Sequence, residues 1–384
     1  MFSDYLKEHY DWDRTTDEIA SMTAYDVERA LARPDGTLSD RDLLALLSPA
    51  AAPYLEQMAR RSRELTERRF GRTISMFIPM YITNSCTNSC VYCGFNHHNR
   101  IKRVILTPEE IEEECRCIKK MGPFENLLIV TGENPKLAGT DYIEKALKIC
   151  RPYFSSLTIE VMPLSTDDYA RLTRSGLNGV ICFQETYHRE RYKVYHPAGM
   201  KSDFEWRVNG FDRMGQAGVH KIGMGILIGL EDWRTDAAMM GRHLVYLRKR
   251  YWKTRYSVNF PRMRPSESGF QPNVVMSDRE LAQVTFAFRI FDPDVDISYS
   301  TREEHSFRNN MATLGVTTMS AGSHTEPGGY ARADQELAQF AISDSTAPDQ
   351  VAADLRKLGR EPVWKDWDRI FDSSTELNHI KSQI

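Results

Sequence analysis

The sequence predicts an α/β fold in which eight parallel strands close into a (β/α)8 TIM-type barrel. Short apolar runs rich in β-branched residues alternate with longer helical segments along the chain. The runs are almost continuously apolar, as in strands that are buried on both faces of a parallel sheet. An open, doubly wound sheet is the alternative, and eight strict alternations favour closure. The predicted strands are residues 75–83, 126–133, 157–164, 179–186, 221–230, 256–263, 296–303 and 316–323.

The helices between these strands carry start and stop signals. Thr107 is followed by a proline and then by Glu110, which together predict a capping box, and Gly122 follows as a stop. Ser165 opens a second helix, and Ser277 opens a third with Glu280 as its capping partner. These signals support helices in the crossovers between strands.

Three regions are expected. Residues 1–70 predict a helical extension, in which residues 42–69 form one long amphipathic helix despite prolines at 49 and 53. Residues 71–323 are predicted to form the barrel. Residues 324–384 predict a C-terminal extension that packs on the barrel, with one helix over 349–358 and an aromatic-rich tail over 363–367.

Composition excludes several classes of protein. Fifty basic and 53 acidic residues give a net charge of −3, which predicts neither nucleic acid nor a membrane surface as a partner. No apolar run approaches the ~20 residues of a membrane helix, and the first 13 residues do not resemble a secretory signal. The expected location is cytoplasmic. Seven cysteines in a reducing compartment indicate metal binding or catalysis rather than disulfides.

Three cysteines directly follow the first predicted strand. Cys86, Cys90 and Cys93 have the spacing C-x3-C-x2-C. Each thiolate can bind one iron of a 4Fe-4S cluster, which leaves the fourth iron open for chemistry. A Cys3His zinc site is the alternative, since His97 and His98 are near. Zinc sites usually combine two ligand pairs, and no second pair is obvious, so the spacing favours the cluster.

The cysteine motif, with an aromatic residue before its last cysteine, resembles the radical S-adenosylmethionine (SAM) superfamily. Further blocks resemble one branch of it, the tyrosine lyases that make 2-iminoacetate (the ThiH branch). The resemblance covers nearly the whole chain. Its blocks are residues 46–51, 92–95, 99–103, 130–133, 184–188, 221–223, 227–230, 257–265, 300–303, 327–331 and 362–368.

The resemblance implies a cofactor set and a reaction. The cofactors are a 4Fe-4S cluster and S-adenosyl-L-methionine, which yield a 5′-deoxyadenosyl radical when one electron enters the cluster. The radical reaction cleaves the Cα–Cβ bond of L-tyrosine into 2-iminoacetate (dehydroglycine) and p-cresol, for the thiazole of thiamine. The implied partners are a thiazole synthase (ThiG) and a flavodoxin- or ferredoxin-type electron donor.

The resemblance also implies which residues contact SAM. Thr131 stands where the family has glycine, and a helix-capping turn is the alternative for this segment. Glu160 lies in an apolar strand, where an unpartnered acid costs free energy. Glycines in strand five allow close approach of adenine, or relieve crowding in the barrel. The expected cofactor-binding residues are Tyr92, Thr131, Gly132, Glu133, Glu160, Gln184, Glu185, Gly223 and Gly225.

Two residues are expected to bind the substrate. Arginine pairs bidentately with a carboxylate, and a free amino acid carries one. By resemblance, Arg302 and Ser320 contact the carboxylate and amine of tyrosine. Arg262 and Arg264 end strand six and form either a further binding group or a salt-bridged rim.

Other functions remain as alternatives. A HydG-like enzyme also cleaves tyrosine but carries C-terminal cysteines for a second cluster, and no cysteine follows Cys182 here. Deazaflavin- and menaquinone-type radical SAM synthases are more distant alternatives. A zinc-stabilised scaffold without activity is the alternative outside the enzymes.

Overall fold

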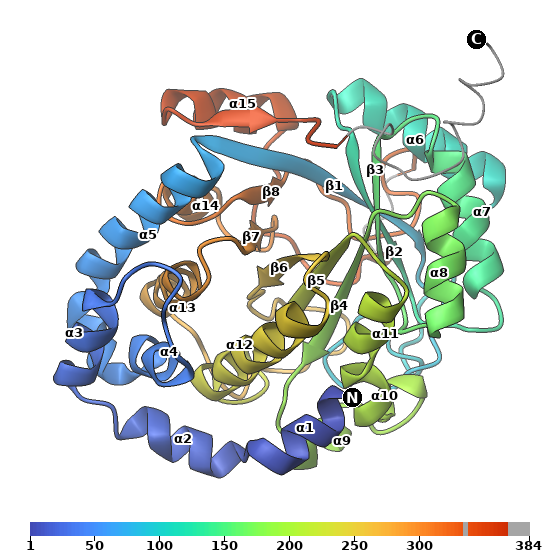
Figure 1. Ribbon diagram of the computed structural model, residues 1–384. Coiled ribbons are helices and arrows are strands. Elements are labelled where there is room, and N and C mark those ends of the chain that lie inside the picture. Colours follow the sequence, from blue (N-terminus) through green and yellow to red (C-terminus); the bar gives the residue numbers. More distant parts are fainter. Residues whose placement is uncertain (333–336, 368–384) are drawn as a thin grey trace, which may run out of the picture.

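The structure is a computed structural model that describes residues 1–332 and 337–367. Eight parallel strands form a closed ring, in which each pairs with the next and β8 pairs with β1 (Figure 1). The predicted barrel is therefore confirmed, and the open sheet is excluded. The strands are β1 Thr73–Thr83, β2 Asn126–Thr131, β3 Ser156–Glu160, β4 Gly179–Glu185, β5 Lys221–Ile226, β6 Arg255–Asn259, β7 Asp296–Tyr299 and β8 Thr318–Ser320.

Most strands stop earlier than predicted. The ladder of β3 ends at Glu160 and that of β7 at Tyr299, although apolar or β-branched residues continue beyond both. The reason is that the polar residues near these ends leave the ladder to form loops at the carboxyl end of the barrel, where catalytic groups of such barrels gather.

Helices surround the ring and bury its outer face. The predicted capping boxes of α6 and α13 are confirmed, with Thr107 and Ser277 as N-caps. The crossover helices are α6 Pro108–Met121, α7 Thr140–Cys150, α8 Thr166–Arg174, α9 Arg189–Tyr195, α10 Phe204–Val208, α11 Gly210–Gln216, α12 Trp233–Arg250, α13 Asp278–Phe291 and α14 His305–Ala312, with a short 3-10 turn, η2, at Met200–Ser202.

The N-terminal 70 residues are helical, as predicted, but the single long helix over 42–69 is wrong. That stretch divides into α4 Asp40–Leu47, η1 Pro49–Tyr54 and α5 Leu55–Phe70. Pro49 forces Ser48 into an extended conformation, and Pro53 lacks the N–H that an α-helix needs. The other helices here are α1 Phe2–His9, α2 Trp12–Ala20 and α3 Ala24–Ala32.

The C-terminal segment returns to the start of the barrel. The predicted helix is present as α15 Pro348–Lys357. A short strand that was not predicted, β9 Glu361–Val363, pairs with Thr73–Ser75 of β1. Trp364 then packs edge-on against Phe124. The remainder of the tail, residues 368–384, lies outside the described residues.

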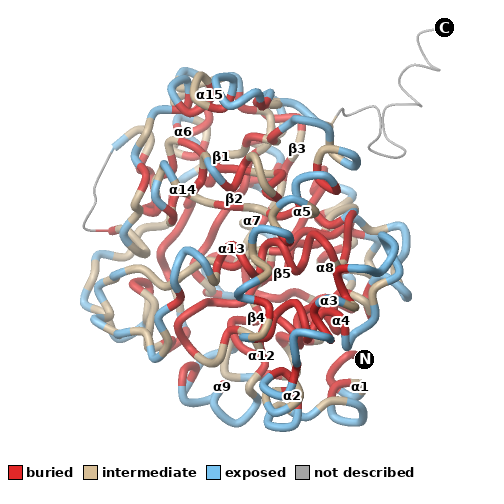
Figure 2. Tube along the Cα trace, turned by 90° about the vertical axis from the view of Figure 1, so that its left-hand side faces the viewer, coloured by how far each residue is buried: buried red, intermediate tan, exposed pale blue. Residues whose placement is uncertain are grey.

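The hydrophobic core is continuous from the barrel wall to the N-terminal helices (Figure 2). Cys115, Cys150 and Cys182 are buried in it, as predicted, while Cys117 is half-buried. Among the described residues, no helix combines the length and apolar character needed to cross a membrane.

Candidate active site

Three adjoining cavities lie along the barrel axis. The outer chamber, at the carboxyl ends of the strands, is lined by the cysteine loop, Glu133, Glu185, Lys201 and Arg207. The inner chamber lies below it, and the two share Glu160 and Arg302 among their walls. The lower chamber occupies the opposite end of the barrel, where the tail residues Asp366 and Trp367 line it.

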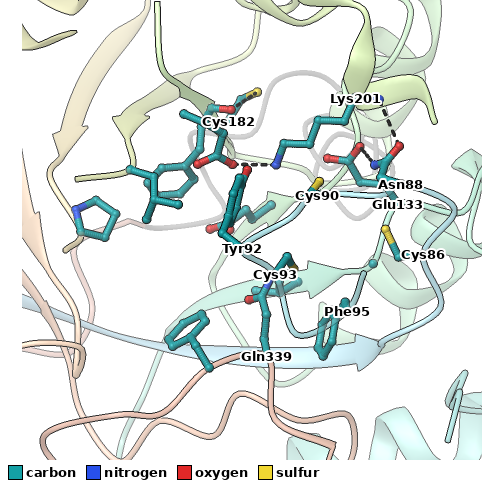
Figure 3. A pocket seen from close by; sticks show the side chains of 18 of the residues that line it. Cys86, Asn88, Cys90, Tyr92, Cys93, Phe95, Glu133, Cys182, Lys201 and Gln339 are labelled. Carbon is teal, nitrogen blue, oxygen red and sulfur yellow. Dashed lines mark hydrogen bonds and ion pairs between the residues drawn. The ribbon is translucent and has the colours of Figure 1, made fainter. Parts of the chain in front are cut away.

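The cysteine loop is held by backbone contacts and by one arginine. Thr87 donates from its backbone N–H and its hydroxyl to the carbonyl oxygen of Glu133, at 2.9 and 3.0 Å. Arg103 donates to four carbonyl oxygens, those of Asn84, Phe95, Asn96 and Asn99, at 2.6–3.1 Å. These bonds hold the irregular loop in place, since its backbone belongs to no helix or sheet. All three thiols line the outer chamber (Figure 3).

The donor set fits a 4Fe-4S cluster. Burial raises the pKa of the Cys86 thiol to about 11 and raises those of Cys90 and Cys93, so iron must displace protons when it binds. A cubane takes one thiolate per iron, whereas zinc needs four donors that converge on one point. Within the described part of the chain, no three His, Cys, Asp or Glu side chains are arranged to hold one metal ion.

The histidines of the zinc alternative lie elsewhere. His97 and His98 are exposed and do not line the outer chamber. The Nε2 atom of His98 is 3.1 Å from the hydroxyl of Ser89, and its ring packs on that of His97. The three thiols therefore face a chamber that neither His97 nor His98 lines.

Two buried ion pairs cross the outer chamber (Figure 3). Lys201 Nζ lies 2.6 Å from Glu185 Oε1, and Arg207 Nη2 lies 2.7 Å from Glu133 Oε1. Asn88 Nδ2 donates to the other oxygen of Glu133 at 2.7 Å. Burial acts to raise the pKa of Glu133, but Arg207 and Lys201 outweigh it and hold that pKa below its ordinary value. Glu133 is thus ionised and fixed in place.

Glu185 has a strained backbone. Its φ of 73° lies in the left-handed region, and it follows a β-bulge between β4 and β5. The bulge turns its carboxylate toward Lys201 and into the outer chamber. Gln184 is fully buried, but it lines none of the three chambers, and neither polar atom of its side chain has a partner among the described residues. Glu185 thus lines the outer chamber, and Gln184 does not.

Tyr92 and Gly132 lie beside the cysteines. The hydroxyl of Tyr92 is 2.8 Å from His196 Nε2, and Lys201 lies over its ring. Gly132 donates its N–H to the carbonyl of Thr83 at 2.8 Å, and a Cβ there would overlap the carbonyl oxygen of Ser85. Glycine at this position lets β2 approach the start of the cysteine loop. Thr131 precedes it and also lines the outer chamber.

The two glycines of β5 do not line the outer chamber. A Cβ at Gly225 would overlap the ring of Phe183, and one at Gly223 would lie 2.7 Å from a side-chain carbon of Ile181. Gly223 lines the lower chamber instead. In this structure both glycines make room for neighbouring side chains, as the crowding alternative supposes.

Arg302 and Glu160 stand between the outer and inner chambers. The guanidinium of Arg302 stacks on Phe340, 3.3 Å from the ring centroid. Among the described residues, no carboxylate lies within ion-pair distance of it. Burial raises the pKa of Glu160 from its ordinary 4.5 to about 7, although Arg302 acts against this shift. A half-buried guanidinium without an ion pair is suited to take the carboxylate of a ligand.

Ser320 lies in the inner chamber. Its hydroxyl oxygen accepts from the backbone N–H of Thr301 at 3.2 Å and from the hydroxyl of Ser323. Arg262 and Arg264 instead share one carboxylate oxygen of Glu303. These two arginines form the salt-bridged rim.

Sequence reasoning missed several residues of the site. Lys201 and Arg207 lie in the crossover after β4 and had no motif around them. Gln339 reaches the site from the C-terminal segment, where its Nε2 lies 3.6 Å from Cys93 Sγ and its Oε1 accepts from the hydroxyl of Tyr81. A contact across 246 residues has no local signal in the sequence.

Comparisons with known proteins identify the family of the chain. The model of the radical SAM superfamily matches residues 80–239, and that of the biotin and thiamin synthesis associated domain matches residues 259–361. The 2-iminoacetate synthase of Salmonella typhimurium is 48% identical, over 93% of this chain and 94% of its own. That of Escherichia coli is also 48% identical, over 96% of this chain and 97% of its own.

Solved structures share the fold. A crystal structure of HydG, a maturase of the [FeFe]-hydrogenase, superposes with a TM-score of 0.85 at 27% identity, covering 92% of this chain and 80% of HydG. Methylornithine synthase (PylB) superposes with a TM-score of 0.70 at 21% identity, covering 88% of this chain and 97% of its own.

Proposed function

The chain belongs to the 2-iminoacetate synthase family of radical SAM enzymes, and we propose that it cleaves the Cα–Cβ bond of L-tyrosine to give 2-iminoacetate and p-cresol. It is a carbon–carbon lyase that uses a 4Fe-4S cluster and SAM. One observation carries the choice of substrate class: a half-buried Arg302, without an ion pair among the described residues, stands where the outer chamber meets an inner chamber with aromatic walls. An aromatic amino acid matches both features.

The cofactors have a matching set of side chains. We propose that Cys86, Cys90 and Cys93 hold the cluster. The residues proposed to hold SAM are Tyr92, Thr131, Gly132, Glu133, Glu160 and Glu185, which all line the outer chamber, together with Lys201. When bound, the cluster and SAM supply the radical that starts the reaction. Gln184, Gly223 and Gly225 have no proposed contact, because none of them lines that chamber.

The protein's own part is to bind, orient and exclude water. Arg302 is proposed to pair with the substrate carboxylate, and Ser320 to donate to the same end of the substrate, as expected from the resemblance. Gln339 and Phe340 of the C-terminal segment line the outer chamber, and their proposed part is to exclude water from it. Shielding protects a reactive intermediate from side reactions.

The unstable product gives a reason for a protein partner. Because 2-iminoacetate hydrolyses in water, we propose that a thiazole synthase (ThiG) docks to receive it, for the thiazole of thiamine. A flavodoxin- or ferredoxin-type donor is proposed to supply the electron. The reduced thiols support a cytoplasmic location. The division into a helical extension (1–70), a barrel (71–323) and a C-terminal extension (324–384) remains part of the proposal.

The test is an anaerobic incubation with SAM, a reductant and tyrosine. We expect p-cresol, with an equal amount of glyoxylate from hydrolysed 2-iminoacetate when no partner is present. Carbon monoxide matching the p-cresol yield would instead support a HydG-like activity, although no cysteine follows Cys182. An absence of p-cresol would overturn the proposed function.

A further inference from the structure

The inner chamber contains a polar side chain, Asn259, to which the proposed function gives no role. Its upper wall carries Arg302, and its lining includes the apolar side chains of Phe77, Val130, Ile181 and Phe183 as well as polar ones. At the far end from the outer chamber lies Asn259, the last residue of β6, which lines both the inner and the lower chamber. Arg302 and Asn259 thus lie toward opposite ends of a chamber whose lining includes several aromatic and aliphatic side chains.

Asn259 faces the barrel interior. Successive inward positions of β6 and its loop are Ser257, Asn259 and Pro261, which follow the alternation of a strand. In register, Asn259 lies opposite Gly225 of β5 and Ser298 of β7. Gly225 has no side chain, and the ring of Phe183 occupies its space. The amide of Asn259 thus lies next to an aromatic wall.

The amide of Asn259 is not satisfied within the protein. Its Nδ2 atom is buried and has no hydrogen-bond partner among the described residues. Buried polar groups are nearly always paired, and an exception calls for an explanation, such as a bound ligand. Some other polar side chains of the inner chamber do have partners: Tyr81 donates to Gln339, and the hydroxyl of Ser320 accepts from Thr301.

A second unpaired atom of the inner chamber is less well placed. Glu303 Oε1 is buried without a partner, but Glu303 follows Arg302 in sequence, and Arg262 and Arg264 hold its other oxygen. It therefore lies at the end of the chamber where Arg302 would bind a carboxylate. Asn259 lies opposite Ser298 of β7 in the sheet. Ser298 precedes Arg302 by four residues along the chain, so Asn259 lies toward the opposite end of the chamber.

We propose that Asn259 donates a hydrogen bond from Nδ2 to the phenol oxygen of the substrate and so sets the preference for tyrosine over phenylalanine. The inference rests on the proposed function. With its carboxylate on Arg302 and its amine toward the outer chamber, an aromatic amino acid places its ring between Phe77 and Phe183 and its para position toward Asn259. A site built to hydrogen-bond a hydroxyl strongly rejects the analogue that lacks it.

The experiment uses the cluster-loaded, full-length enzyme. In the wild type, phenylalanine should inhibit p-cresol formation with an inhibition constant at least tenfold above the KM for tyrosine. The variant Asn259→Leu should raise the KM for tyrosine by roughly 10- to 100-fold. The same variant should change the inhibition constant of phenylalanine by less than threefold, because phenylalanine makes no use of the amide.

A matched control is Asn309→Leu. Asn309 also has a buried, unpartnered Oδ1, but it belongs to α14 and lines none of the three chambers. The Asn309→Leu variant should leave the ratio of the inhibition constant of phenylalanine to the KM for tyrosine unchanged. Iron content and tyrosine-free SAM cleavage report whether each variant is folded.

The outcomes separate the two proposals. If the wild type makes p-cresol but phenylalanine competes as well as tyrosine, Asn259 is not a specificity residue, and this result needs no variant that folds. If Asn259→Leu raises the KM for tyrosine and the inhibition constant of phenylalanine by the same factor, Asn259 shapes the chamber but does not bind the phenol hydroxyl. This result would also overturn the inference. If the wild type makes no p-cresol, the proposed function fails first.

Discussion

The two ends of the barrel interior are both polar, yet they differ in whether all of their charged side chains have a partner. In the lower chamber, Lys221 pairs with Asp296 at 2.6 Å and Ser75 donates to Asp366 at 2.6 Å. The upper end also has ion pairs, Lys201–Glu185 and Arg207–Glu133. In addition, Arg302 has no ion pair within the described residues, and Glu160 has neither a hydrogen bond nor an ion pair there. Ion pairs are thus common to both ends, whereas charged groups without a partner mark the end that is organised for a ligand.

The largest expected effect is at the cysteine loop. Cys90→Ala removes one of three thiolates, so the variant should lose the cluster and form no 5′-deoxyadenosine above background. Iron content and deoxyadenosine are measured together. Cys115→Ala is the control, since that cysteine is buried between α6 and α7, with its Sγ 3.6 Å from that of Cys150. Deoxyadenosine formation by Cys90→Ala would show that this loop is not the cluster site.

The next effect is at Arg302. Removing one partner of a buried charge pair costs about 2–5 kcal/mol, so Arg302→Ala should raise the KM for tyrosine at least ~30-fold. Slow SAM cleavage without tyrosine should persist, because the cysteines are untouched.

Tyramine sharpens this prediction. It lacks the carboxylate and should compete poorly with tyrosine in the wild type. If tyramine competes as well as tyrosine, Arg302 does not bind the substrate carboxylate. The contrast drawn between the two ends of the barrel would then be wrong.

A smaller effect concerns pH and Glu160. Burial raises its pKa from 4.5 to about 7. Between these values the native state holds the proton and the unfolded state releases it, so this group lowers the free energy of unfolding as the pH rises. In cluster-free protein at pH 8, Glu160→Gln should therefore be more stable than the wild type by about 1–3 kcal/mol, and the difference should shrink toward pH 5. Urea unfolding at both pH values measures it. A difference that is independent of pH would contradict the shifted pKa.

The smallest effect is at the lower chamber. Asp366→Ala removes the hydrogen bond from Ser75, which contributes about 0.5–1.5 kcal/mol to the free energy of unfolding. Tyrosine cleavage should stay within twofold of the wild type, because this residue lies at the far end from the cofactors. A tenfold loss of p-cresol formation with normal stability would break the comparison, since it would give the lower end a part in the reaction.

The sequence predicted the parts of the fold that depend on local patterns. Continuous apolar runs, Thr107 and Ser277 as helix caps, and the close spacing of Cys86, Cys90 and Cys93 all act over a few residues. The prolines at 49 and 53 divide the predicted helix over 42–69, and the amphipathic pattern alone does not indicate this break.

Long-range geometry could not be predicted in this way. Lys201 meets Glu185 only because a bulge gives Glu185 a positive φ. Whether Gly225 admits adenine or the ring of Phe183 depends on how the neighbouring strand packs. Gln339 reaches Cys93 only after the chain has gone around the whole barrel. Such contacts follow from the closed ring rather than from any short segment.

The pairing of β9 with β1 has a consequence for how the protein is made. On the ribosome, the first barrel strand emerges long before Gln339 and the β9 segment Glu361–Val363 that contact it and its loop. Chains fold from the N-terminus as they are synthesised. The cysteine loop can therefore be enclosed only when translation is nearly complete. The period before release is a natural window for the insertion of iron and sulfide, and a prematurely terminated chain would leave its thiols open to oxidation.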